Sequence, residues 1–204
     1  MNKIGVFGGT FNPVHKGHEL IALDFYNKFK LDKLIIMPAN IPPHKNIDAK
    51  ITAEQRYEMC KICFDKYKDY DIDVSDFEIK KDGTSYSYNT VTEIKKDYID
   101  AKIYFLVGSD MFLYLENWYK YQELIKLCAF AVAFRSERDK REVLELREKF
   151  IKMGAEIELL QNEPFEISST ELRGHIKNNN FDLDKYMSAE ILDYIKERNI
   201  YVLQ

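Results

Sequence analysis

The chain has 204 residues, of which 46% are hydrophobic and 31% charged, and its formal net charge is −4. This is enough apolar material for one α/β domain with its own core, and the nearly balanced charge argues against binding of nucleic acid through a clustered positive excess. Neither a run of about eighteen apolar residues nor an apolar leader is present, so we expect a cytoplasmic protein with no membrane span and no membrane partner. The sequence leaves the oligomeric state open, a homo-oligomer included.

Strand-like and helix-like segments alternate along the chain. Short apolar runs predict strands, and apolar residues at helical intervals, such as Ile21, Phe25 and Phe29, predict helices. In chain order we predict a strand at 3–7, a helix at 15–30, a strand at 33–37, a helix capped by Thr52 and Gln55, a strand at 72–79, a helix at 89–98, a strand at 102–107, a helix at 119–127, a strand at 129–134, a helix from 136 to 154, a strand at 157–160 and a helical remainder.

This alternation predicts the fold class. Apolar strands separated by helices form a parallel sheet that is covered on both faces. We therefore expect an α/β protein with a Rossmann-like, doubly wound, mainly parallel sheet and a helical C-terminal end at about 167–204. Since no repeat, low-complexity tract or long linker interrupts the pattern, we expect residues 1–204 to form a single domain.

Two of the predicted strands end in polar motifs that contain glycine, G-G-T-F at 8–11 and G-S-D at 108–110. In doubly wound folds, ligands bind beyond the carboxyl ends of the strands, where the strand order reverses. Gly8 and Gly9 have no Cβ, so their backbone can approach a ligand closely and offer N–H groups to an anion. A G-G turn alone is equally consistent with an ordinary tight turn.

Two histidines strengthen the interpretation as an anion site. His15 and His18 are three residues apart, which places both imidazoles on one face of the first helical turn. Imidazole N–H groups can donate hydrogen bonds to phosphoryl oxygens. A metal site is the alternative, but no third ligand lies at a suitable spacing, so we expect no metal bound by protein side chains.

The cysteines carry a different expectation. Cys60 and Cys63 form a C-x-x-C pair, but the pair falls inside a predicted amphipathic helix and has no second pair for zinc. With Cys128 they make an odd set, which suits reduced thiols. We expect buried structural thiols.

A cluster of hydroxyl groups precedes the C-terminal helical part. Ser168, Ser169 and Thr170 gather hydroxyls and N–H groups at a predicted helix start, which favours phosphate binding. An ordinary N-cap needs only one hydroxyl. Arg173 lies one helical turn further on and can reach the same anion.

Two other segments contain candidate binding residues. His44 and Lys45 follow two prolines that stiffen their loop, although a solvated loop pair is the alternative. Trp118 is the only tryptophan and lies in a polar context, where its indole can stack on a planar ring. A core position is the alternative for Trp118.

These motifs together resemble a known family. G-G-T-F-N-P-V-H-K-G-H at 8–18 resembles the H-x-G-H signature of the nucleotidyltransferase superfamily, and I-S-S-T-E-L-R at 167–173 resembles its I-S-S-T-x-x-R motif. The resemblance is narrowed to the bacterial nicotinate-nucleotide adenylyltransferases by four further motifs, namely P-A-N-I-P-P-H-K at 38–45, S-Y-S-Y-N-T-V at 85–91, G-S-D-M-F at 108–112 and N-W-Y at 117–119. Many members have Asp where Asn12 and Asn89 stand, so we assign neither residue a role that depends on charge.

The resemblance implies that ATP and nicotinate mononucleotide react to give deamido-NAD and pyrophosphate, with Mg²⁺ accompanying ATP. It implies catalytic roles for His15, His18 and Arg173. It implies an ATP site made of Gly8, Gly9, Thr10, Phe11, His15, His18, Gly108, Asp110, Ile167, Ser168, Ser169, Thr170 and Arg173. It implies a mononucleotide site made of Asn40, His44, Lys45, Ser87, Tyr114, Trp118 and Arg135. Recognition of the nicotinate carboxylate is expected to use N–H dipoles near residues 87–89.

Two alternatives stay open. Another adenylyltransferase of the superfamily, acting on phosphopantetheine or nicotinamide mononucleotide, would share both end motifs, although the phosphopantetheine enzyme would lack P-P-H-K and N-W-Y. A non-catalytic nucleotide-binding protein could keep the glycines, but it would have no need of both histidines together with the serine cluster.

Overall fold

The computed structural model describes residues 2–44, 51–134, 139–161 and 167–201. Its elements are β1 (Lys3–Gly9), α1 (Lys16–Phe29), β2 (Lys33–Pro38), α2 (Ala53–Phe64), β3 (Ile72–Val74), α3 (Ser87–Asp97), β4 (Lys102–Gly108), α4 (Ser109–Leu113), the 3₁₀ helix η1 (Leu115–Asn117), α5 (Tyr121–Leu127), β5 (Ala129–Ala133), α6 (Lys140–Lys152), β6 (Ile157–Leu160), α7 (Ser169–Lys177) and α8 (Ala189–Glu197).

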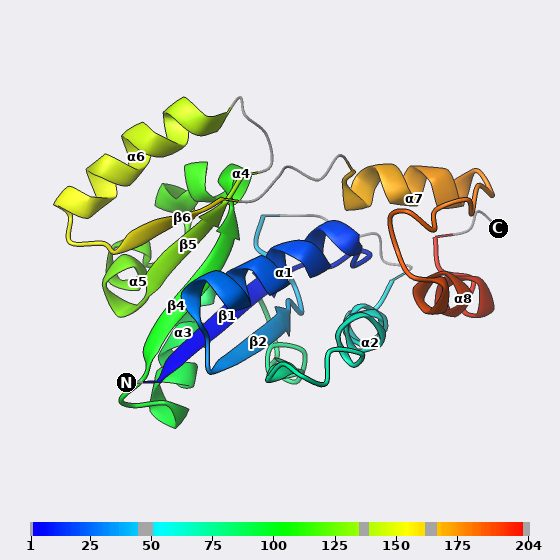
Figure 1. Ribbon diagram of the computed structural model, residues 1–204, viewed down its shortest axis with the longest axis horizontal. Helices are drawn as coiled ribbons and strands as arrows, with labels where there is room; N and C mark the ends of the chain where they lie inside the picture. Colours follow the sequence, from blue (N-terminus) through cyan, green and yellow to red (C-terminus); the bar gives the residue numbers. More distant parts are fainter. Residues whose placement is uncertain (1, 45–50, 135–138, 162–166, 202–204) are drawn as a thin grey trace.

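The described strands form one sheet in the order β3-β2-β1-β4-β5-β6, and every neighbouring pair is parallel (Figure 1). This order reverses between β1 and β4, so the carboxyl ends of these two strands flank the crevice where ligands bind in such folds. The prediction of a Rossmann-like, doubly wound α/β fold is confirmed. The G-G-T-F and G-S-D motifs both begin at this reversal.

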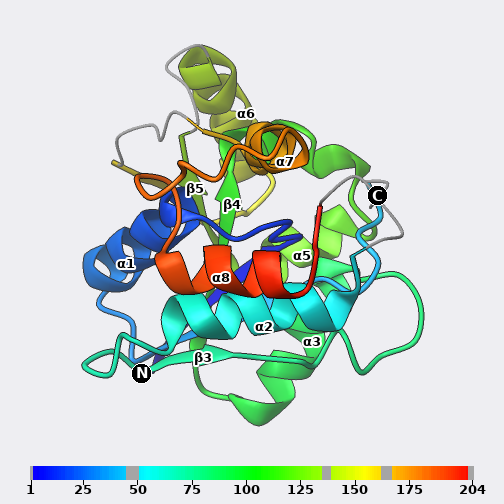
Figure 2. The ribbon, with the colours of Figure 1, turned by 90° about the vertical axis from the view of Figure 1, so that its right-hand side faces the viewer.

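Each face of the sheet carries its own hydrophobic core. Along β4, Tyr104 and Leu106 belong to the cluster covered by α1, α2, α7 and α8, while Phe105 and Val107 belong to the cluster covered by α3, α4, α5 and α6. This alternation follows from the two-residue period of a strand whose two faces are both buried. The C-terminal α8 lies beside α2 (Figure 2). Because the core under α8 is continuous with the core under α1, we propose that the chain forms a single domain.

Most of the predicted boundaries lie within a few residues of the observed ones. The capping box of α2 is present, since the Thr52 hydroxyl accepts from the Gln55 N–H at 3.2 Å and the Gln55 side chain accepts from the Thr52 N–H at 2.9 Å. Cys60, Cys63 and Cys128 are free and buried, as predicted, and burial raises the pKa of each thiol. None of the helices that the structure describes is both long and apolar enough to cross a membrane.

Three predictions differ from the structure. The strand predicted at 72–79 ends at Val74, because the chain turns where the N–H of Lys80 bonds to the carbonyl of Asp76. The helices α4 and η1 were not predicted, since elements of five and three residues are too short to show a helical period. The helix predicted to follow residue 136 begins at Lys140, and residue 136 itself lies outside the described residues.

Gly5 tests how tightly α1 packs on β1. A Cβ added at Gly5 would lie 2.4 Å from Leu31 Cδ1 and 2.8 Å from Phe25 Cε1. We therefore expect Gly5→Ala to lower the free energy of unfolding by about 1–3 kcal/mol through overpacking. Gly174→Ala is the matched control, because a Cβ there meets nothing within 4 Å, and in a helix it should raise stability by up to about 1 kcal/mol. Urea unfolding of both variants measures this, and an unchanged midpoint for Gly5→Ala would contradict it.

Candidate active site

Two adjoining cavities open at the reversal between β1 and β4. The first has a volume of about 290 Å³ and the second about 300 Å³. They share Phe7, His18, Leu106, Gly108 and Ser168. The predicted site residues that line the first are Gly8, Gly9, Thr10, Phe11, His18, His44, Ser87, Gly108, Trp118, Ser168, Ser169, Thr170 and Arg173, and those that line the second include His15 and Ile167. The structure thus brings together motifs from both ends of the chain.

His15 and His18 form a reciprocal cap at the start of α1. His15 is the N-cap residue, and its Nδ1 accepts from the Gly17 N–H at 3.1 Å, while Nδ1 of His18 accepts from the His15 N–H at 3.3 Å. Because both Nδ1 atoms accept, the neutral form of each ring carries its proton on Nε2. The ring centroids are 3.9 Å apart. Both rings therefore lie at a helix N-terminus and line the second cavity, where the dipole also favours an anion.

The ring of Phe11 packs against one member of this histidine pair, His18. The Phe11 backbone has a φ of +48°, in the left-handed region, and the residue is 2% exposed. The ring packs edge-on against Phe7 and His18, with centroid distances of 5.2 Å in both cases. A Cβ at Gly9 would lie 2.9 Å from the same ring. The second glycine is thus required for the packing of Phe11, in addition to any approach of a ligand.

The start of α7 lies beside the loop after β1 (Figure 1), and side chains of α7 donate hydrogen bonds to carbonyls of that loop. Arg173 donates from Nη1 to the carbonyl of Asn12 at 2.6 Å and from Nη2 to the Thr170 hydroxyl at 3.1 Å. The Ser169 hydroxyl donates to the carbonyl of Pro13 at 2.9 Å, and Ser168 caps the helix. Each of the three hydroxyls therefore has a structural partner while it lines the cavity.

The structure gives Asn12 an uncharged role. Its side chain is 8% exposed, and its Oδ1 accepts a hydrogen bond from the hydroxyl of Tyr201. Burial raises the pKa of Tyr201, so that hydroxyl stays a donor. An amide serves this bond without adding negative charge beside the cavity.

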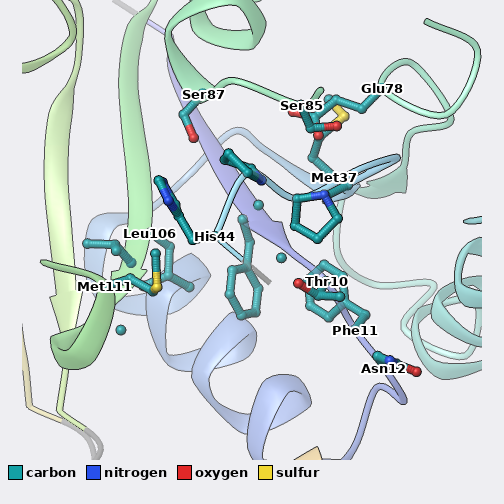
Figure 3. A pocket seen from close by; sticks show the side chains of 18 of the residues that line it. Thr10, Phe11, Asn12, Met37, His44, Glu78, Ser85, Ser87, Leu106 and Met111 are labelled. Atoms are coloured by element: carbon teal, nitrogen blue, oxygen red, sulfur yellow. The ribbon is translucent and has the colours of Figure 1, made fainter. Parts of the chain in front are cut away.

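Aromatic side chains line the opposite end of the first cavity. The ring of His44 lies 4.9 Å from that of Tyr114 and 6.5 Å from that of Trp118, and burial lowers the pKa of His44. His44 points into the cavity, as does Ser87 at the start of α3 (Figure 3). Trp118 packs edge-on against Phe105 of the core and also lines the cavity.

Some predicted site residues are placed elsewhere. The side chain of Asn40 donates to the carbonyl of Lys81 at 2.9 Å, and Asn40 does not line either cavity as the described residues define them. Asp110 and Tyr114 also line neither of the two described cavities. Lys45 and Arg135 lie outside the described residues.

Two charged residues at the site were not predicted. Glu78 lines the first cavity and Arg56 lies behind it, and they are 9% and 1% exposed. Arg56 carried a usable signal, because it shares the apolar face of α2 with Met59, Cys60 and Cys63, where a charge is unexpected. Glu78 lies in a segment without periodicity, and nothing in its neighbours marked it.

Comparisons with known proteins identify the family and support the fold. Residues 6–175 match the family model described as cytidylyltransferase-like. A Clostridium acetobutylicum protein named "Probable nicotinate-nucleotide adenylyltransferase" is 37% identical over 99% of this chain and 100% of its own length, and a Clostridium botulinum protein of the same name is 34% identical over 96% and 97%. The fold is similar to that of Plasmodium falciparum nicotinic acid mononucleotide adenylyltransferase complexed with NaAD, with a TM-score of 0.81, 21% identity and 98% coverage of both chains.

The buried carboxyl of Glu78 predicts a pH-dependent stability. Burial raises its pKa, although Thr90 donates to it. A raised pKa in the folded state means that ionisation destabilises the protein as pH rises above the unfolded value of about 4. We therefore expect Glu78→Gln to be more stable than wild type at pH 7, with the difference vanishing near pH 4. Urea unfolding between these values measures this difference.

Glu93→Gln is the control for that series. Lys96 lowers the pKa of Glu93. Glu93→Gln should therefore lower the free energy of unfolding at pH values above about 4. The same pH trend in both variants would contradict the role of burial at Glu78.

Proposed function

The chain belongs to the nicotinate-nucleotide adenylyltransferases of the cytidylyltransferase-like family, and we propose the following mechanism and site for its reaction. It transfers the adenylyl group of ATP to nicotinate mononucleotide, giving deamido-NAD and pyrophosphate. The observation that carries the mechanism is the His15–His18 pair at the start of α1, where His18 lines both of the adjoining cavities.

The reaction needs alignment and charge stabilisation. The nucleophile is a phosphate oxygen of the mononucleotide that is already ionised at pH 7, so no general base is required. The barrier arises from repulsion between two anions and from charge that gathers on the α-phosphoryl group and the leaving pyrophosphate. Donors held in position before the reaction lower such a barrier.

We assign the triphosphate to the donors shared by the two cavities. His15 and His18 would bind it from the start of α1, together with the backbone of residues 8–11. Arg173 and residues 168–170 would bind its other side, because a guanidinium has five N–H donors and Arg173 uses Nη1 and Nη2 for two bonds here. The adenosine would occupy the second cavity, beside Gly108 and Ile167, with Asp110 near its ribose.

We assign the mononucleotide to the aromatic end of the first cavity. Trp118 would stack on the pyridinium ring. The N-terminus of α3 has no side-chain cap among the described residues, so the N–H groups beginning at Ser87 can receive the nicotinate carboxylate. His44 would contribute from the facing loop. Roles for Asn40, Tyr114, Lys45 and Arg135 rest on the resemblance alone.

Mg²⁺ would accompany ATP and reduce the negative charge of the triphosphate. In the described part of the chain, three His, Cys, Asp or Glu side chains are nowhere grouped to hold a metal. We therefore take oxygens of the nucleotide as its ligands, which suits a cation that binds substrate phosphates. We also propose a cytoplasmic location, on the sequence features given above.

His18→Ala tests the donor pair. We expect kcat to fall about 10²–10³-fold, with a much smaller change in the KM for the mononucleotide, because one donor to the developing charge is lost. His175→Ala is the control, because His175 lies on α7 and lines neither described cavity; it should leave kcat unchanged. Steady-state pyrophosphate release measures both, and a loss of less than about tenfold for His18→Ala would refute the assignment.

The mononucleotide site predicts selectivity for nicotinate over nicotinamide. The amide of nicotinamide mononucleotide would place an N–H₂ group against donors that are aimed at a carboxylate. Each donor left unpaired costs about 1–3 kcal/mol of binding free energy. With two such donors, kcat/KM for nicotinate mononucleotide should exceed that for nicotinamide mononucleotide by more than about a hundredfold. Trp118→Ala should lower kcat/KM for both mononucleotides by a similar factor, because both stack on the indole. The ratio of the two kcat/KM values should therefore be retained. A wild-type ratio near one would contradict the assignment of the carboxylate to α3.

A further inference from the structure

Arg56 is a buried cation that joins two loops of the site. Its Nη1 donates to the carbonyl of Thr10 at 2.8 Å, and its Nη2 donates to the carbonyl of Asn40 at 2.9 Å. Thr10 follows β1 and Asn40 follows β2, whereas Arg56 is supplied by α2. One planar guanidinium thus spans two loops that carry the phosphate donors and the mononucleotide residues.

The bond to Thr10 acts on the neighbouring peptide group. The carbonyl of Thr10 and the N–H of Phe11 belong to one rigid planar unit and point in opposite directions. Phe11 has a φ of +48°, a conformation that is unfavourable for a residue with a Cβ and persists only where its surroundings hold it. The ring of Phe11 in turn packs 5.2 Å from the ring of His18. Arg56 is therefore connected to His18 through a single strained residue.

The bond to Asn40 completes a second set of contacts. The N–H of Asn40 donates to the Ser85 hydroxyl at 2.9 Å, and its side chain donates to the carbonyl of Lys81 at 2.9 Å. The next residues along this loop, Pro42 to His44, line the first cavity, as does Ser85 (Figure 3). The Arg56 bond thus fixes the backbone carbonyl of Asn40, the residue at which the loops after β1, β2 and β3 meet.

Packing alone does not account for an arginine at this position. Arg56 is 1% exposed, it shares an apolar face with Met59 and Cys60, and its Nε has no hydrogen-bond partner among the described residues. An apolar side chain of similar length would fill this space without the desolvation of a charge. Its value must lie in the two carbonyl groups that it holds.

We infer that Arg56 is a positioning residue for the adenylyl transfer: it holds the Thr10–Phe11 turn, and through it His18, in register with the mononucleotide loop at Asn40. This inference rests on the proposed function for the identity of the two substrates. It assigns Arg56 no contact with either of them.

The test compares Arg56→Met and Arg56→Lys with Arg147→Met. Arg147 is the matched control, because its Nε also donates to a backbone carbonyl, that of Ile157 at 3.0 Å, but on α6 and away from the site. We expect Arg56→Met to raise the KM for both ATP and nicotinate mononucleotide at least about tenfold and to lower kcat, because both loops lose their common anchor. Arg56→Lys should have KM and kcat values between those of wild type and Arg56→Met, because an ammonium group cannot bond to both carbonyls with the planar geometry of a guanidinium. Arg147→Met should lower Tm while both KM values stay within about twofold.

Wild-type KM values in a folded Arg56→Met, or in a folded Arg56→Lys if the first variant does not fold, would overturn the inference. Equal KM changes in Arg147→Met would also overturn it, because they would show a general effect of stability. Calorimetric binding of ATP and of pyrophosphate separates this inference from the proposed function. If wild type makes no deamido-NAD, the proposed function fails, whereas weakened binding in both Arg56 variants still supports the positioning role and unchanged binding refutes it.

Discussion

The loop after β1 has carbonyl groups that side chains from distant elements must satisfy. The carbonyl of Thr10 bonds to Arg56 of α2, that of Asn12 to Arg173 of α7, and that of Pro13 to Ser169. Buried backbone groups left without partners are costly, so this loop can hold its shape only when α2 and α7 are in place. The geometry of the whole site depends on these bonds, because the loop ends in the histidine pair.

Local N–H groups and helix N-termini explain how a protein with a negative net charge can offer a site for anions. The net charge is −4, yet the described cavities are bordered by the N-termini of α1, α3 and α7, by three imidazoles and by Arg173. Helix N-termini and fixed N–H groups act over one turn and need no excess of basic residues. Held rigidly, they require little reorganisation when charge develops on a phosphoryl group.

The two ends of the first cavity differ in the way their shape is maintained. At the phosphate end, hydrogen bonds from side chains to carbonyls dominate, and Asn12 adds a neutral amide bonded to Tyr201. At the other end His44 and Trp118 line the cavity in ring contact with each other, and the ring of His44 also contacts that of Tyr114. In the proposed assignment, the aromatic end receives the planar pyridinium and the hydrogen-bonding end receives the triphosphate.

Local patterns in the sequence determined the strand and helix order, the capping box of Thr52, the burial of the cysteines and the position of the histidine pair. Each depends on residues a few positions apart, where periodicity and spacing suffice. Tertiary structure alone decided that Asn40 bonds to Lys81, that Asn12 bonds to Tyr201, and that Arg56 and Glu78 lie at the site. These contacts join residues as many as 189 positions apart, and no local spacing encodes which partners the folded chain brings together.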